Sequence, residues 1–115
     1  MLSIEKNGKA EREIRRRIVG EFLRKERQKA GLTQQAVAKA FSYATAQFIS
    51  NWERGLSLPP LNAIARLCEL YAISASSMVE VLYRYEQDLL KVQRAQLIEL
   101  LSKDSAVRAK RRSKR

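Results

Sequence analysis

The chain has 115 residues, of which 45% are hydrophobic and 30% are charged, as is typical of one small folded domain with short extensions. It contains no histidine, which removes the commonest general base and metal ligand, and its single cysteine excludes an internal disulfide. No apolar run approaches the roughly 18 residues that a membrane-spanning helix needs. We therefore expect a cytoplasmic protein that holds no metal and no cofactor and does not enter a membrane.

The positive charge lies mainly at the two ends of the chain. The net charge is +11, with six basic and three acidic side chains in residues 1–17 and seven basic and one acidic in residues 103–115. Basic ends on a nearly neutral body are typical of proteins that meet phosphate, on nucleic acid or on an anionic membrane. We expect a flexible basic arm over 1–10. We also expect a disordered basic tail over 104–115, because this last segment has almost no apolar content.

Scarce glycine and proline residues divide a helix-forming composition into segments, and no segment alternates apolar and polar residues as a strand does. Apolar residues recur at helical spacing. The expected helices span residues 11–30, 34–41, 46–54, 61–72 and 75–103, with a break allowed by the polar stretch 91–96. Gly31 and Gly55 are expected to end the first and third helices, and Thr33, Thr45 and Ser74 to cap the second, third and last. The predicted fold class is all-α.

The apolar stripes predict which side chains face the core. In the third helix, the inward spacing includes Phe48, Ile49 and Trp52. In the fourth helix, the predicted stripe consists of Leu61, Ile64, Leu67, Cys68 and Tyr71.

The last helix carries more apolar surface than the end of a small domain needs. A heptad-like seam is formed by Met78, Leu82, Tyr85, Leu89 and Val92. A second apolar set follows in a shifted frame over 97–101. Such a surface is covered either by a second copy of the chain, which we favour, or by folding back over its own domain. The predicted dimerisation helix is therefore 81–103.

Two sequence motifs at a fixed separation stand out. The first is Gly-Leu-Thr-Gln at 31–34, and the second is Ile-Ser-Asn-Trp-Glu-Arg-Gly at 49–55. Together they resemble the phage-repressor and Cro-like helix–turn–helix family, often called XRE-type, over about half of the chain. The resemblance implies a five-helix repressor-like DNA-binding domain over 11–80 with an extended C-terminal helix. The turn between the two motif helices is one residue longer than the commonest family spacing, and Ser42 replaces the usual glycine, so we expect a slight shift of the third helix.

The third helix is the expected recognition helix, whose N-terminal outward face enters the major groove. Glutamine and asparagine can bond to the adenine edge, and alanine can contact the thymine methyl. The residues expected to read bases, by outward position and by the resemblance, are Thr45, Ala46, Gln47, Ser50 and Asn51. The alternative is that these side chains are merely solvated on a surface helix.

Further roles follow from the resemblance. Thr33 and Gln34 open the second helix, whose free N–H groups suit a DNA phosphate, and Arg54 is a candidate phosphate clamp. For Arg54 the alternative is a cation that only complements the helix dipole. Arg27 and Glu53 match a structural ion pair that ties the first helix to the third, which we favour over a catalytic pair.

The predicted function is sequence-specific binding of double-stranded DNA by a dimeric transcriptional regulator of bacterial or phage type, acting on the nucleoid. Two alternatives stay open. One is a weakly specific architectural or RNA-associated protein dominated by its basic ends, and the other is an antitoxin-like adaptor that binds a partner protein through the C-terminal helix. An enzyme is not expected, because histidine, a glycine-rich phosphate loop and a carboxylate pair beside a nucleophile are all missing.

Overall fold

The structure is a computed structural model that describes residues 8–113, with the backbone alone for 104–113. Three segments run on without a break as one first helix: α1 (Lys9–Arg15), the π-helical turn η1 (Arg16–Gly20) and α2 (Glu21–Lys29). They are followed by α3 (Gln34–Ala40), α4 (Gln47–Glu53), α5 (Leu61–Tyr71) and α6 (Ala75–Ser113). Over the described range the chain therefore forms five helices and no strand, which confirms the predicted all-α fold with a long C-terminal helix.

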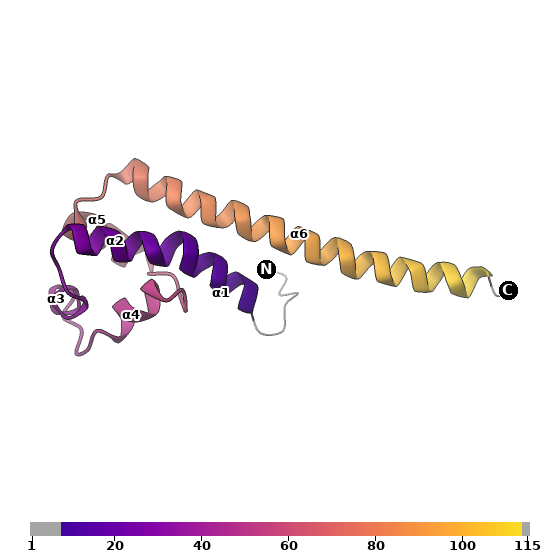
Figure 1. Cartoon of the computed structure of the whole chain (residues 1–115), viewed down its shortest axis with the longest axis horizontal. Coiled ribbons are helices and arrows are strands. Elements are labelled where there is room, and N and C mark those ends of the chain that lie inside the picture. The colour runs from indigo at the N-terminus through magenta and orange to yellow at the C-terminus, as the bar shows by residue number, and fades with distance from the viewer. Residues whose placement is uncertain (1–7, 114–115) are drawn as a thin grey trace.

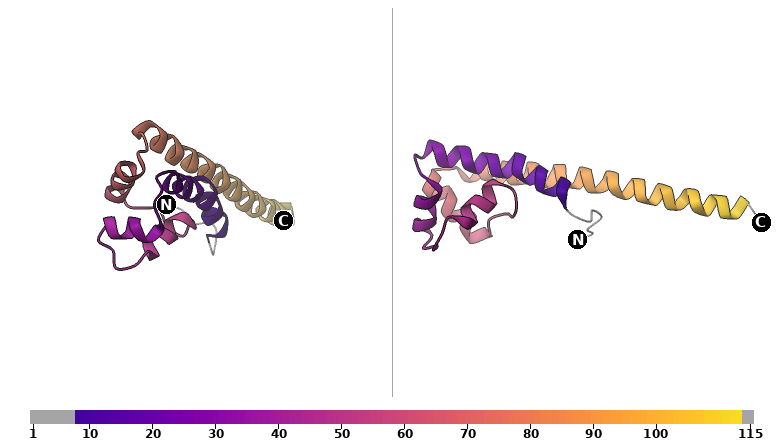
Figure 2. Two further views of the ribbon diagram at one scale, coloured as in Figure 1. Left: turned by 60° about the vertical axis from the view of Figure 1, so that its left-hand side comes forward. Right: turned by 60° about the horizontal axis from the view of Figure 1, so that its bottom comes forward.

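The first helix and α6 lie side by side and run in opposite directions, with α3, α4 and α5 packed on the other side of the first helix (Figures 1 and 2). The second half of α6 projects beyond the start of α1, which makes the molecule long and narrow, 69 × 29 × 20 Å. Along the described residues no helix is both long enough and apolar enough to cross a membrane.

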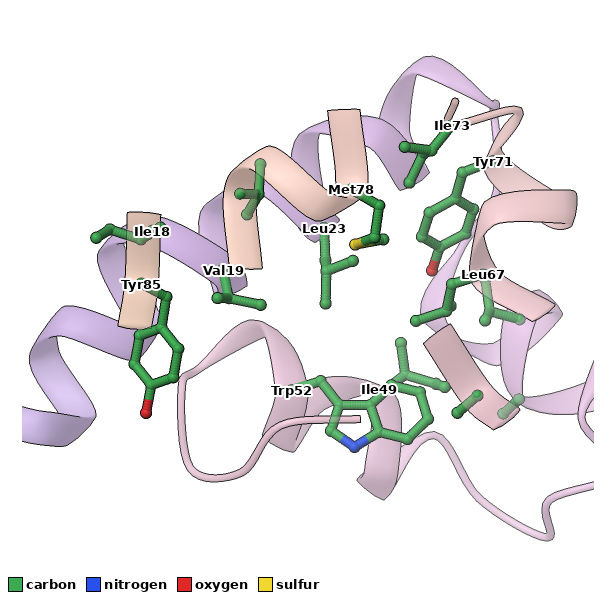
Figure 3. Close-up of a cluster of buried hydrophobic side chains, with 14 of the residues drawn as sticks. Ile18, Val19, Leu23, Ile49, Trp52, Leu67, Tyr71, Ile73, Met78 and Tyr85 are labelled. Atoms are coloured by element: carbon green, nitrogen blue, oxygen red, sulfur yellow. The ribbon is translucent and has the colours of Figure 1, made fainter. Parts of the chain in front are cut away.

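The core lies where the first helix meets α4, α5 and the beginning of α6 (Figure 3). Val19, Val37, Ile49 and Leu67 are its most completely buried side chains. Each contributes about 1.5–3 kcal/mol by leaving water. Because these four side chains come from four different helices, burying them joins the helices into one body.

The first helix and α4 approach each other so closely that glycine is required on both sides. A Cβ atom on Gly20, in η1, would collide with the backbone carbonyl of Glu53 at the end of α4. A Cβ atom on Gly55 would collide with the backbone of Arg16. Arg15 stabilises this contact, because its Nε donates a hydrogen bond of 2.8 Å to the Gly55 carbonyl. The position of α4 is therefore set directly by the first helix.

The N-caps are those predicted from the sequence, except at α4. Thr33 Oγ1 accepts from the Ala36 amide at 3.0 Å, and Ser74 Oγ accepts from the Ser77 amide at 3.2 Å. The third helix begins one residue later than predicted, at Gln47, so that Ala46 occupies the N-cap. Thr45 still supports this end, because its Oγ1 accepts from the Gln47 amide at 3.3 Å.

The predicted extensions at the two ends were too long. Lys9 and Ala10 belong to α1 rather than to a flexible arm, and residues 1–7 lie outside the described residues. At the other end α6 has no break at 91–96 and continues to Ser113, so 104–113 are helical where a disordered tail was predicted. The reason is that an existing helix needs no new nucleus, and this stretch, in which arginine and alanine are the commonest helix formers, has no glycine or proline to stop it. Residues 114–115 are outside the described part.

Two residues expected in the core are on the surface. Phe48 is 55% exposed and Leu61 is 83% exposed. The seven-residue α4 buries only the face with Ile49, Trp52 and Glu53, and Phe48 lies beside that face. In α5 the buried stripe starts from Ala63, which leaves Leu61 outside it. Cys68 is half-buried, and burial raises the pKa of its thiol, which favours packing over reactivity.

The heptad-like seam of α6 packs against its own chain. Met78 and Tyr85 are buried in the core, and Leu82, Leu89 and Val92 are half-buried against it. They lie along α1 and η1, to which α6 is also joined by an ion pair of 3.4 Å between Arg17 and Asp88. Of the two ways to cover the seam, folding back over the same domain is the one observed. Pairing of two chains through the helix 81–103 stays a prediction.

Candidate functional site

The inner face of α4 is held by a buried ion pair. Arg27, on α2, donates from Nε to Glu53 Oε2 at 2.7 Å and from Nη2 to Glu53 Oε1 at 3.1 Å. Both residues are buried, so the two charges have little access to water. The hydrogen bond to Glu53 raises the pKa of Arg27, which keeps the guanidinium charged. A bidentate pair of this kind fixes both the position and the rotation of α4.

Glu53 also links the pair to α3. Its Oε1 accepts a second hydrogen bond, of 3.0 Å, from Gln34 Nε2, and Arg27 Nη1 donates to the Leu32 carbonyl at 2.8 Å. The Tyr71 hydroxyl lies close by. Burial raises the pKa of this phenol, and the nearby negative charge of Glu53 raises it further. Among the described residues no buried side-chain nitrogen or oxygen lacks a partner. The network therefore joins α2, α3 and α4 with every polar group satisfied.

The turn between α3 and α4 combines strain with aromatic packing. Ser42 adopts a left-handed conformation with φ +58°, the conformation for which glycine is favoured. The Tyr43 amide then donates to the Ala38 carbonyl at 2.9 Å, which closes the turn. The Tyr43 ring stacks on Phe41 at a centroid distance of 5.2 Å and contacts Phe48 at 5.0 Å. These contacts give the longer turn a defined shape.

The outer face of α4 carries a row of hydrogen-bonded polar side chains. Gln47 Nε2 donates to Asn51 Oδ1 at 2.8 Å, and Arg54 Nη2 donates to the same oxygen at 3.0 Å. Gln47 and Arg54 are exposed and Asn51 is half-exposed. Since each side chain of this row restrains its neighbour, the row faces solvent in an ordered arrangement.

The structure separates the predicted base-reading residues into two groups. Gln47 and Asn51 lie together in the exposed row, with Ser50 half-exposed on the same helix. Thr45 is exposed beside the start of α4, but Ala46 is half-buried and packs against the core. Ala46 therefore has less freedom to meet a ligand than its neighbours.

The predicted phosphate contacts lie at two separate places. Thr33 and Gln34 lie at the start of α3, where the Thr33 hydroxyl serves as the N-cap and the Gln34 amide is bonded to Glu53. Arg54 lies at the other end, just after α4. Their role toward phosphate stays a prediction.

Sequence reasoning missed a basic groove that the fold forms at Arg54. A groove of about 410 Å³ between α1 and the end of α4 is lined by Lys9, Arg12, Glu13, Arg16, Arg54 and Leu56. Arg16 is occupied by ion pairs with Glu13 and Glu21, the latter at 2.8 Å, whereas Arg12 is exposed. The excess of basic residues in 1–17 was the available signal. Arg12 and Arg16 lie in the expected first helix, but helical spacing alone does not show what this basic face adjoins.

Comparison with known proteins identifies the family. Residues 18–80, more than half of the chain, match a family described as a helix–turn–helix domain. No curated protein and no solved structure matches the chain. The matched region contains α3, the turn and α4, and it confirms the helix–turn–helix resemblance that the two motifs carry. Domains of this type bind DNA through their second motif helix, which here is α4. The chain belongs to the helix–turn–helix domain family.

Proposed function

We propose that the protein is a sequence-specific regulator of transcription, of bacterial or phage type, that places α4 in the major groove of double-stranded DNA. The observation that carries this proposal is the contrast across α4. Its inner face is fixed by the pair Arg27–Glu53, and its outer face presents the ordered row Gln47–Asn51–Arg54. Direct reading of bases requires donors and acceptors held at fixed positions, which this arrangement supplies.

Gln47 and Asn51 are the proposed readers of adenine. Asn51 Oδ1 already accepts two hydrogen bonds, so its NH₂ group is the part left to meet an acceptor on a base. The Gln47 carbonyl oxygen is likewise left to accept from the adenine amino group. Ser50 and Thr45 flank this pair as secondary contacts, and Ala46 contributes little because it packs inward.

The proposed phosphate contacts flank the reading face. Arg54 is shared between the polar row and the basic groove, where Arg12 adds another exposed guanidinium. Residues 108–115 hold six more basic side chains. Phosphate contacts position the protein on the duplex and carry no base information directly. Deleting 108–115 should therefore make the salt dependence of binding several units shallower, at about 0.9 per phosphate contact, and leave the ratio of specific to random affinity unchanged.

Selection of bound sequences from a random DNA pool tests the proposal directly. On the selected site, Gln47→Ala or Asn51→Ala should lose about 1–3 kcal/mol of binding free energy, and binding to random DNA should change little. Gln87→Ala, at an exposed glutamine on α6, is the matched control and should leave both affinities unchanged. Equal losses on both DNAs, or no selected sequence at all, would contradict base reading and favour a weakly specific architectural protein.

The proposed assembly is a dimer formed through the projecting part of α6. The seam is used within the chain, but Leu90, Ile98, Leu100 and Leu101 are exposed apolar side chains farther along the same helix. A cluster of this kind on a soluble domain marks an interaction surface. A second copy would bring a second α4, so the selected site should be an inverted repeat with half-sites about 34 Å apart.

Light scattering of Ile98→Asp, Leu101→Asp tests this assembly. Both side chains are exposed, so the body should stay folded while the mass falls to that of a monomer. The double variant Glu99→Gln, Lys103→Gln is the control on the same stretch and should remain a dimer. A monomeric parent protein, or co-purification of a stoichiometric second protein that the Asp variant loses, would favour the adaptor alternative.

A further inference from the structure

Phe48 is an exposed aromatic side chain on the helix that the proposed function places in the major groove. It lies in the first turn of α4, directly after Gln47, and 55% of its surface is exposed. Ile49, Trp52 and Glu53 are the residues of α4 that are buried. Within α4, Phe48 is the one large apolar side chain left in solvent.

The ring cannot turn into the core, because other aromatic side chains already fill the space behind it. Tyr43 contacts Phe48 with the ring planes tilted by 51°, and Tyr43 itself packs against Phe41 and, edge to face, against Trp52. Phe48 is therefore supported from behind by Tyr43 and exposed in front. Because the ring is held in water, its contact with an apolar group of a ligand would remove apolar surface from water, which is favourable.

In the major groove, the base edge with an apolar group is that of thymine, whose C5-methyl projects into the groove. The first turn of a recognition helix is the part that approaches base edges. Phe48 and the proposed adenine reader Gln47 are adjacent on this turn. A methyl group against the Phe48 ring would remove apolar surface from water on both sides.

We infer that Phe48 is a specificity-determining residue that reads thymine by contact of its ring with the C5-methyl group. This inference rests on the proposed function and adds a reader that hydrogen bonding does not provide. It also implies that the preferred site has a thymine next to the base read by Gln47.

Uracil in place of thymine tests the contact, since the two bases differ only by this methyl group. Each thymine of the selected site is replaced in turn, and affinity is measured for the parent protein and for Phe48→Ala. The parent should lose about fourfold in affinity at one thymine, which corresponds to the burial of one methyl group at about 0.8 kcal/mol. Phe48→Ala should not distinguish thymine from uracil at that position, and should keep any uracil response at other positions.

Two further variants separate the contact from effects on folding. Phe48→Leu keeps an apolar side chain and should retain part of the uracil response, and Leu61→Ala, at an exposed leucine on α5, should retain all of it. A uracil response that survives in Phe48→Ala, or a parent protein that binds its preferred site with no uracil response, overturns the assignment and leaves the proposed function standing. Absence of any preferred site overturns both.

Discussion

The two faces of α4 are stabilised in opposite ways. The inner face contacts the first helix and α3 through a buried ion pair, two glycine contacts and the side chains of Ile49 and Trp52. On the outer face, the polar side chains of Gln47, Asn51 and Arg54 are ordered by hydrogen bonds to one another. Changes on the inner face should therefore act on stability, and changes on the outer face should act on DNA binding alone.

Loss of the Glu53 carboxylate should have the largest effect on stability. Glu53→Ala leaves the Arg27 guanidinium buried without its partner, which costs about 3–5 kcal/mol in the free energy of unfolding. Urea denaturation measures this, with Glu86→Ala on α6 as an exposed control that should change little. The double variant Arg27→Met, Glu53→Leu should be more stable than Glu53→Ala, because no unpaired charge remains. If the double variant is the less stable one, the stranded charge is not the cause.

The second largest loss of stability is expected from crowding at Gly20, where the first helix contacts α4. In Gly20→Ala the added methyl group meets the backbone of Glu53, which cannot yield as a flexible side chain would. We expect a loss of about 1–3 kcal/mol and a shift of α4. Thermal unfolding and binding to the selected site should both be affected. A variant with parent stability and parent affinity would show that the first helix does not set the position of α4.

Relief of turn strain should stabilise the protein by a smaller amount. Ser42→Gly removes the penalty of a left-handed conformation and should raise the free energy of unfolding by about 1 kcal/mol. Ala72→Gly is the matched variant, since Ala72 has φ +55° at the end of α5, away from the turn before α4. Similar gains are expected in both. A change in base preference in Ser42→Gly alone would show that the turn adjusts the register of α4.

The smallest effect on stability is expected in the basic groove. Arg12 is exposed, so Arg12→Ala should leave the free energy of unfolding almost unchanged. The slope of log affinity against log salt should become shallower by about 0.9, the amount that one phosphate contact contributes. Arg84→Ala on α6 is the control with the same loss of charge, and should leave the slope unaltered. Equal slopes for Arg12→Ala and the parent would place DNA away from α1.

Features that depend on neighbouring residues in the chain could be predicted from the sequence alone. The caps at Thr33 and Ser74 and the helix end at Gly31 follow from local hydrogen bonding and backbone conformation. The spacing of the two motifs was enough to identify the helix–turn–helix domain, since each motif position has a local physical role in it. The pair Arg27–Glu53 could be anticipated only through the family resemblance.

Only the tertiary structure decided which part of the chain packs on a given helix face. Helical spacing shows that Leu82 and Leu89 share an apolar stripe, but not whether the same chain or another covers it. The same spacing placed Phe48 inward, because a helix of two turns has too few residues to define its buried face. Likewise Arg12 joins Arg54 only because Gly20 and Gly55 bring the first helix against α4. Such contacts depend on distances through space, which periodicity along one helix does not contain.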